Sequence, residues 1–282
     1  MQKRALGKTG ETLSLVGLGG IVVAHLPQEE ASRIVAEAVD RGVNYFDVAP
    51  TYGDAEERLG PALEPYRKGV FLACKTIERG KEGSQRDLET SLRRLRTDHL
   101  DLYQLHGLTA VEEVEEVFGA EGAMETFVAA REAGKVRFLG FSAHSMKAAE
   151  EALKRFAFDT VLFPFNFVCW HHGFGPRVME AAKARGAGRL ALKALAKTDW
   201  PDKDNKKWGK CWYQPYDDPE NVDLALRFTL SLEVTAAIPP GEPELFRMAL
   251  AVAEKFSPLS VEESDQLRET AKGIVPILSQ QS

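Results

Sequence analysis

The chain has 282 residues, of which 44% are hydrophobic and 28% are charged, and its formal net charge is −6. This composition is typical of a globular protein long enough to bury a sizeable core. A mildly acidic chain has no electrostatic reason to hold nucleic acid or an anionic membrane, so we expect neither as a partner. We also expect no transmembrane helix, because no apolar run reaches about 18 residues, and no signal peptide, because residues 1–7 lack an apolar core.

The three cysteines, Cys74, Cys169 and Cys211, are odd in number, widely spaced and without a CxxC pair. This pattern argues against a disulfide framework or a cysteine-rich metal site. It favours a reducing compartment, and we expect a cytoplasmic protein.

Short apolar runs alternate with longer amphipathic stretches along the chain. Residues 4–13 predict a β-hairpin around Gly7-Lys8-Thr9-Gly10, and residues 13–18 predict a first strand that ends at Gly19-Gly20. Residues 27–41 predict a helix, because Pro27 suits its first turn and apolar residues recur every three to four positions.

The same cycle repeats through the rest of the chain. Further strands are predicted at residues 43–47, 69–75, 100–105, 138–142, 160–163, 190–192 and 235–238. Further helices are predicted at residues 55–63, 84–95 with Ser84 as a candidate cap, 120–133, 146–156, 176–185, 219–232, 243–255 and 261–273. The acidic connection 110–119 predicts a solvated loop or a short helix. The long connection 196–218 predicts either a lid or a loop that packs on its own barrel.

Eight strand-then-helix units predict parallel strands joined by right-handed crossovers. We therefore predict an α/β fold in which residues 1–282 form one domain. That domain is a single (β/α)₈ TIM barrel with an N-terminal β-hairpin cap and an extra C-terminal helix. An open doubly wound sheet produces the same local signals and is the alternative.

Polar residues end several of the predicted strands, where reactive groups of such a barrel belong. Asp47, with Tyr52 in the following loop, comes from the second strand, Lys75 from the third and His106 from the fourth. A charge at the end of an apolar strand costs desolvation unless it is paired, so we expect Asp47 and Lys75 to be partners. Later strands end at Ser142, His144, Asn166 and Lys193. Singly, these residues have ordinary structural interpretations, but their joint placement at one rim favours an active site.

The stretch from Gly42 to Gly53, followed by Glu57-Arg58-Leu59-Gly60, resembles the signature of the aldo-keto reductase superfamily. Lys75, the segment 100–106 and the segment 134–142 resemble the next motifs of that family, in order. The resemblance covers nearly the whole chain. It implies an NAD(P)H-dependent oxidoreductase that reduces an aldehyde or ketone to an alcohol by hydride transfer.

The resemblance also implies a role for each of the four residues. Tyr52 is the general acid that protonates the carbonyl oxygen, and the Lys75 ammonium lowers the pKa of its phenol. Asp47 keeps Lys75 charged and in place. His106 orients the carbonyl of a small-molecule substrate.

The same resemblance assigns cofactor contacts to Gly20, Ser142, Asn166, Lys193, Ile238, Pro240, Gly241 and Arg247. Some positions depart from the family pattern: Ala143 and Leu162 replace amide residues, and Lys193 replaces the aromatic residue that stacks on nicotinamide. The turn at 238–243 has no basic residue for an adenosine phosphate, Glu242 would repel a 2′-phosphate, and the nearest cation in sequence is Arg247. The resemblance favours NADP(H), and NAD(H) is possible.

Two other functions fit the same barrel. One is a cofactor-binding regulatory or scaffold protein with little turnover. The other is an isomerase or aldolase that uses Lys75 to form a Schiff base. We predict no metal site, because the adjacent His171 and His172 point to opposite faces of an extended segment and no Glu or Cys completes a ligand set with His144. The substrate and the oligomeric state are not predicted.

Overall fold

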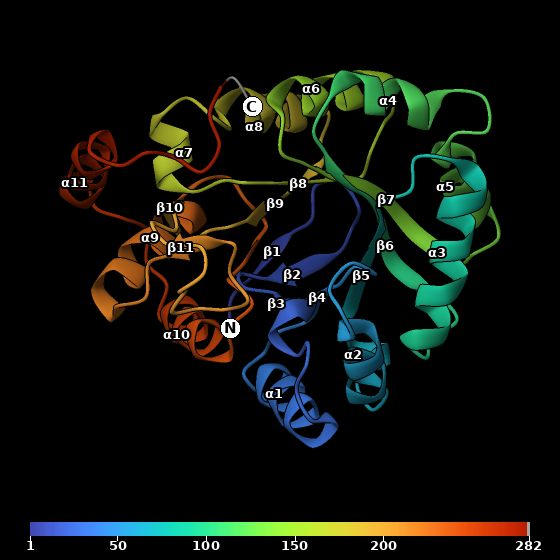
Figure 1. Ribbon diagram of the computed structural model, residues 1–282, viewed down its shortest axis with the longest axis horizontal. Helices are drawn as coiled ribbons and strands as arrows, with labels where there is room; N and C mark the ends of the chain where they lie inside the picture. The colour runs from blue at the N-terminus through green and yellow to red at the C-terminus, as the bar shows by residue number, and fades with distance from the viewer. Residues whose placement is uncertain (281–282) are drawn as a thin grey trace.

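A barrel of parallel strands lies at the centre of a ring of helices in the computed structural model, which describes residues 1–280 (Figure 1). The spatial order of the eight strands is β12-β9-β8-β7-β6-β5-β4-β3. The barrel closes where Val16 pairs in parallel with Ala237, beside β3 and within β12. The closure confirms the barrel and excludes the open sheet. The strands are β3 (Leu18–Gly19), β4 (Tyr45–Asp47), β5 (Phe71–Thr76), β6 (Leu100–Leu108), β7 (Val136–Ala143), β8 (Thr160–Phe163), β9 (Gly188–Leu192) and β12 (Ala236–Ile238).

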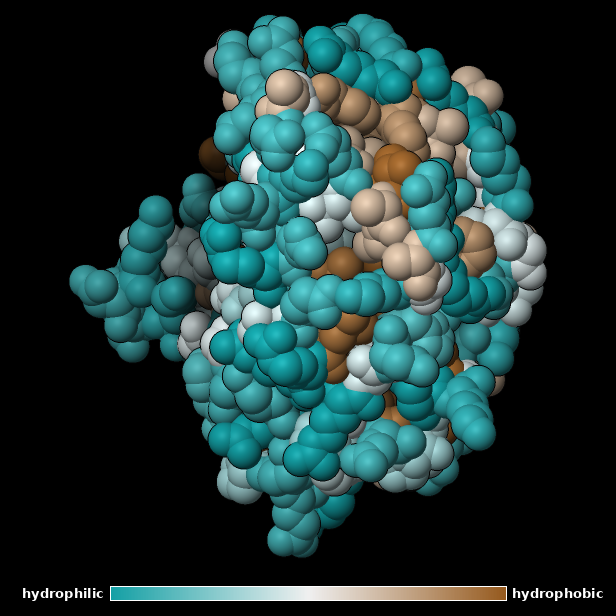
Figure 2. Space-filling view, turned by 90° about the vertical axis from the view of Figure 1, so that its right-hand side faces the viewer, coloured by the Kyte–Doolittle hydropathy of each residue, from teal (hydrophilic) through white to brown (hydrophobic). Residues whose placement is uncertain are grey.

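Amphipathic helices cover the outside of the barrel. In α1, for example, Ala31, Ile34, Val35 and Ala38 are buried against the strands while charged residues face outward. On the face shown in Figure 2, hydrophilic side chains accordingly cover most of the surface and hydrophobic ones gather in patches. Over residues 1–280, no helix has the length and hydropathy needed to cross a membrane. The helices are α1 (Gln28–Asp40), α2 (Ala55–Leu63), α3 (Lys81–Arg94), α4 (Val111–Phe118), α5 (Ala123–Glu132), α6 (Met146–Arg155), α7 (Phe167–His171), α8 (Pro176–Ala184), α9 (Pro219–Ser231), α10 (Pro243–Glu254) and α11 (Val261–Lys272).

The predicted N-terminal hairpin is present and consists of β1 (Lys3–Ala5) and β2 (Thr12–Ser14), in the middle of the ring in Figure 1. Leu6 and Leu13 of the hairpin are fully buried in the apolar cluster inside the barrel, with Tyr45, Phe71 and Leu102. The hairpin therefore fills the end of the barrel at which the strands begin.

The prediction of one strand over residues 13–18 is wrong. Ser14 belongs to β2, and the barrel strand β3 starts only at Leu18. The chain is held between these strands by side-chain hydrogen bonds: the Ser14 hydroxyl donates to the carbonyl of Val16 at 2.8 Å, and the Asn44 amide oxygen accepts from the backbone N–H of Ser14 at 2.7 Å. Residues 13–18 are thus divided between the hairpin sheet and the barrel sheet.

Three helix predictions also need correction. Helix α3 begins at Lys81, so Ser84 is no cap, and its hydroxyl donates to the Lys81 carbonyl. Helix α5 begins at Ala123 and not at residue 120, whereas the acidic connection before it forms the short helix α4, which confirms one of its two predicted alternatives. His171 ends the short helix α7, so His171 and His172 do not lie on an extended segment as predicted. Over residues 1–280, no three His, Cys, Asp or Glu side chains are grouped to hold a metal ion.

The connection 196–218 contains a second hairpin, β10 (Ala196–Asp199) and β11 (Tyr213–Pro215). Indole N–H groups tie this connection to itself: Trp200 donates to the carbonyl of Cys211 at 2.9 Å, and Trp208 donates to Asp217 at 2.8 Å. From this connection, the Lys210 ammonium also donates to the carbonyls of Ile21 and Val22, which lie in the 3₁₀ turn after β3. The connection therefore packs on its own barrel, as one of the two interpretations predicted.

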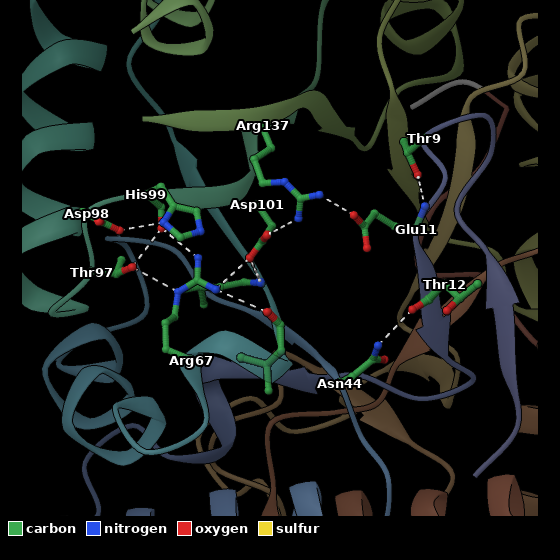
Figure 3. Close-up of polar contacts among 12 residues, drawn as sticks. Thr9, Glu11, Thr12, Asn44, Arg67, Thr97, Asp98, His99, Asp101 and Arg137 are labelled. Atoms are coloured by element: carbon green, nitrogen blue, oxygen red, sulfur yellow. Dashed lines mark hydrogen bonds and ion pairs between the residues drawn. The ribbon is translucent and has the colours of Figure 1, made fainter. Parts of the chain in front are cut away.

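A network of charged side chains ties together the beginnings of the strands (Figure 3). The buried Asp101 carboxylate accepts from the backbone N–H of Leu72 at 2.8 Å and pairs with Arg67 at 3.0 Å and Arg137 at 2.7 Å. Arg137 also pairs with Glu11 of the hairpin. These interactions join β5, β6, β7 and the hairpin at the end of the barrel that lies opposite the mouth, where polar groups serve stability.

Replacing Asp101 with Asn should destabilise the fold by about 3 kcal/mol, because it leaves two partly buried guanidinium groups without their shared anion. Urea unfolding followed by circular dichroism measures the change in free energy. The matched control is Asp98→Asn, whose fully exposed carboxylate faces His99 in the same region and whose loss should leave the unfolding midpoint unchanged. Equal effects of the two substitutions would contradict the structural role of Asp101.

Candidate active site

A buried ion pair lies inside the barrel at the end where the strands finish. Asp47 of β4 and Lys75 of β5 hydrogen-bond to each other, and their side chains are 3% and 1% exposed. Because side chains alternate along a strand, both point into the barrel, on the same faces as Tyr45 and Ala73 of the interior cluster. The pairing expected from the sequence is therefore present.

Neighbouring groups form further hydrogen bonds with the Asp47 carboxylate and the Lys75 ammonium. One Asp47 oxygen accepts from the Tyr45 hydroxyl at 3.1 Å and from the Gln104 amide at 3.0 Å, and the Lys75 ammonium also donates to the carbonyl of Val48 at 3.2 Å. A buried ion pair needs such hydrogen bonds to offset its desolvation. Tyr45 and Gln104 were not predicted as site residues. Their positions could have indicated them, because Tyr45 lies two residues before Asp47 on β4 and Gln104 lies two residues before His106 on β6, so each pair faces the same side of its strand.

Tyr52 lies over the ion pair, with the Lys75 ammonium 5.2 Å from the centre of its ring. Burial raises the pKa of the Tyr52 phenol, and Lys75 opposes this increase without cancelling it. The net pKa of the Tyr52 phenol lies above its ordinary value, although Lys75 acts on it in the expected direction. The ammonium nevertheless favours the phenolate that would form when Tyr52 gives up its proton.

His106 stands edge-on to Tyr52, with ring centres 5.6 Å apart and planes at 87°. Burial, and then the positive charge of Lys75, lower the pKa of His106 to about 3, so the imidazole is neutral at physiological pH. The Arg79 guanidinium donates to the backbone carbonyl of His106 at 2.9 Å and pairs with Glu113 at 2.9 Å. These contacts hold the end of β6 in place.

A backbone irregularity aims His106 at the site. The register of β6 against β7 shifts between Leu105 and Leu108, and Gly107 adopts a φ of +64°, a conformation that favours glycine. The backbone N–H of Gly107 donates to the Ser142 hydroxyl of β7 at 2.8 Å. Ser142, expected as a cofactor contact, therefore also fixes the position of His106.

The later strands bring three further expected residues to the same rim. The Asn166 amide oxygen accepts from the backbone N–H of Cys169 at 2.9 Å and caps α7, while its buried amide nitrogen has no partner among residues 1–280. Lys193 follows β9 with a φ of +60°, and its ammonium is 2.8 Å from Nε2 of His144. The ring of Trp212, from the β10–β11 connection, lies 5.4 Å from the same ammonium.

The first and last barrel strands bring the remaining expected contacts together. Gly20 starts the 3₁₀ turn after β3, and Gly241 lies so close to Ile21 that a Cβ there would be 2.2 Å from its side chain. Ile238 ends β12, and Pro240 precedes Gly241 in the segment that links β12 to α10. Arg247 is not directed at this turn, because it pairs with Glu37 of α1 at 2.9 Å.

Lys210 is the cation that the structure brings to this turn. Its backbone N–H donates to the Glu242 carboxylate at 2.8 Å, in addition to the two bonds from its ammonium to the turn after β3. Burial lowers the pKa of Lys210. The sequence analysis took Arg247 as the nearest cation and missed Lys210, since Lys210 is 32 positions away from Glu242 along the chain.

Comparison with known proteins agrees with this arrangement. The model of the aldo/keto reductase family matches residues 15–269. The chain is 31% identical over 180 residues to "Uncharacterized oxidoreductase YqkF" of Bacillus subtilis, covering 59% of this chain and 56% of that protein. It is 30% identical over 224 residues to "Uncharacterized oxidoreductase YrpG" of the same organism, covering 70% and 67%. The matched part thus spans about half the length of the first relative and two thirds of the second.

A solved structure shares the fold over its full length. Aldo-keto reductase AKR11C1 from Bacillus halodurans, in its holo form, superposes with a TM-score of 0.76 at 23% identity, covering 99% of both chains. The family model accounts for most of the chain, and the relatives are named as oxidoreductases. The chain belongs to the aldo/keto reductase family.

Proposed function

We propose that this protein reduces an aldehyde or ketone to an alcohol, with a nicotinamide dinucleotide as the hydride donor and Tyr52 as the general acid. The observation that carries the proposal is the buried Asp47–Lys75 pair beneath the Tyr52 ring. The Lys75 ammonium held there would stabilise the Tyr52 phenolate that remains after the phenol has given up its proton.

The proton passes from the Tyr52 hydroxyl to the carbonyl oxygen as the carbonyl carbon accepts hydride. Asp47 keeps Lys75 in place and charged, while Lys75 holds its positive charge beside the developing phenolate. His106, being neutral, donates a hydrogen bond to the carbonyl oxygen without competing with Tyr52 as a strong acid. The bound cofactor supplies the hydride, and the protein supplies position and electrostatics.

The residues at the rim fit a nicotinamide ring in part. The unpartnered amide nitrogen of Asn166 is suited to donate to a carboxamide oxygen. The stacking position is held by Lys193, and the aromatic ring beside it is that of Trp212. At the other end, Gly20, Ile238, Pro240 and Gly241, together with the backbone N–H groups at the start of α10, are suited to hold phosphate oxygens.

Schiff-base chemistry at Lys75 is disfavoured by its surroundings. Burial lowers the pKa of Lys75, but Asp47 and Tyr52 raise it more, so the net pKa lies above the ordinary value. A lysine that attacks a carbonyl must be unprotonated. Lys75 is therefore suited to act as a fixed cation.

Tyr52→Phe should lower kcat by at least about 100-fold, because it removes the proton donor. Its affinity for the cofactor, measured by fluorescence titration, should stay close to that of the parent. The matched control is Tyr66→Phe, which changes a part-buried tyrosine that packs against the outer core and should leave kcat intact. Undiminished turnover in Tyr52→Phe would end the assignment. A parent protein that binds the cofactor but turns over no carbonyl in a broad panel would support the scaffold alternative.

Glu242→Gln should raise the affinity for NADPH relative to NADH by about fivefold, since the amide keeps the hydrogen bond to Lys210 but removes a negative charge near the expected 2′-phosphate. Titration of each variant with both dinucleotides measures the ratio. Glu244→Gln, an exposed acid in the first turn of α10, is the control and should change the ratio little. An unchanged ratio in Glu242→Gln would place the 2′-phosphate elsewhere.

A further inference from the structure

Lys193 is a buried amine without an acidic partner. It is 8% exposed, and no carboxylate of residues 1–280 lies within the 4.0 Å that defines an ion pair. The other fully buried lysine at the rim, Lys75, has Asp47. An uncompensated buried charge is strongly unfavourable. The Lys75 ammonium is paired with a carboxylate, whereas no carboxylate among residues 1–280 pairs with the Lys193 ammonium.

The backbone at Lys193 is also costly. Its φ of +60° is uncommon for a residue with a side chain, and such conformations persist where the surrounding structure imposes them, often at ligand sites. The conformation accompanies a side chain whose ammonium reaches His144, the residue that directly follows β7. Strand β9 lies between β8 and β12 in the barrel, and β12 leads to the expected phosphate site. The Lys193 ammonium reaches away from β12, toward the residue that follows β7. Lys193 is thus directed toward the Tyr52 side of the barrel mouth.

The groups around the Lys193 ammonium are neutral or positive. Burial and Lys193 lower the pKa of His144 to about 3, so His144 is a neutral acceptor for the ammonium. The buried thiol of Cys169 on α7 has its pKa raised by burial and stays protonated. His106 is also neutral, because burial, then Lys75, and in smaller part Lys193 lower its pKa to about 3. An anion entering the mouth would therefore meet no negative charge on this side.

We propose that Lys193, held by His144 and bordered by Trp212, is an anion subsite that selects carbonyl substrates carrying a carboxylate. This inference rests on the proposed function, because it places the carboxylate at Lys193 while the carbonyl faces Tyr52 and His106. A carboxylate there would complete the buried charge and accept a charge-assisted hydrogen bond from the ammonium. The exposed face of Trp212, which is 49% exposed, offers an apolar wall for the body of such a substrate.

The test compares substrates that differ only in charge. 4-Carboxybenzaldehyde and its neutral methyl ester are reduced by the parent enzyme, by Lys193→Met and by Lys193→Arg. We expect the parent to prefer the acid in kcat/KM by about tenfold or more, Lys193→Met to lose that preference, and Lys193→Arg to keep part of it. The control is Lys197→Met, which removes a lysine of β10 whose ammonium lies 5.6 Å from the centre of the Tyr216 ring; it should keep the preference.

The preference should also depend on pH in a defined direction. Burial lowers the pKa of Lys193 to about 7. The ammonium is therefore present below about pH 7 and is lost above it, while His144 and His106 remain neutral across this range. The ratio of acid to ester should fall in the parent as the pH rises from 6 to 9, and it should stay flat in Lys193→Met.

A binding measurement separates this subsite from the reaction. Terephthalate, which has two carboxylates and no reducible carbonyl, should quench the fluorescence of Trp212 in the parent and in Tyr52→Phe, but not in Lys193→Met. Binding that depends on Lys193 in a protein that reduces no carbonyl would uphold the subsite and reject the proposed reaction. Turnover with equal kcat/KM for acid and ester would reject the subsite and leave the reaction standing.

Two further results would overturn the subsite. One is a loss of NADPH or NADH affinity in Lys193→Met that exceeds its loss of terephthalate affinity, because Lys193 would then serve the cofactor. The other is unchanged terephthalate binding in Lys193→Met. Circular dichroism checks that the variants fold, and if Lys193→Met does not fold, Lys193→Arg and the pH profile of the parent still decide the matter.

Discussion

The hydrogen-bonded ion pair of Asp47 and Lys75 is the interaction on which the site depends. Both groups are buried inside an apolar barrel, where an unpaired charge of either sign would be strongly unfavourable. Tyr45, Gln104 and the Val48 carbonyl take up the hydrogen bonds that the pair leaves over. The Lys75 ammonium is therefore a positive charge that the protein's own groups hold in a fixed position beneath Tyr52. It also depresses the pKa of His106, so one pair shapes both of the groups expected to contact the carbonyl.

The barrel separates the residues that stabilise it from those that face the mouth. Where the strands begin, Asp101 is shared by two arginines, and the hairpin closes the interior with Leu6 and Leu13. Where the strands end lie Lys75, which is paired with Asp47, and Lys193, which has an uncommon backbone conformation and no carboxylate partner among residues 1–280. Their costs are tolerable because the opposite end and the helical shell hold the strands in register. The polar groups that join the strands at their beginnings are therefore separate from those that line the mouth of the barrel.

Much of this arrangement could be predicted because local periodicity encodes it. The alternation of strands and helices predicted eight units, and the last polar residue of each apolar run predicted Asp47, Lys75 and His106 at one rim. What local patterns do not encode is contact between distant segments. Lys210 reaches Glu242 and the turn after β3 from the long connection, and nothing in its immediate neighbours indicates this. The division of residues 13–18 between two sheets depends likewise on Asn44, 30 positions away from Ser14.

Balances between opposing effects were harder still to predict. The proximity of Lys75 to Tyr52 could be predicted, because the two residues follow neighbouring strands. The direction in which the pKa of Tyr52 shifts could not, because burial raises this pKa while the ammonium lowers it, and the effect of burial is larger. The same reasoning explains Lys193. From the sequence it is a departure from an aromatic position, whereas the structure shows that its surroundings neutralise His144 and leave the ammonium without an anion. Because this buried ammonium has no anionic partner among residues 1–280, the proposed subsite is one that a negatively charged substrate would complete.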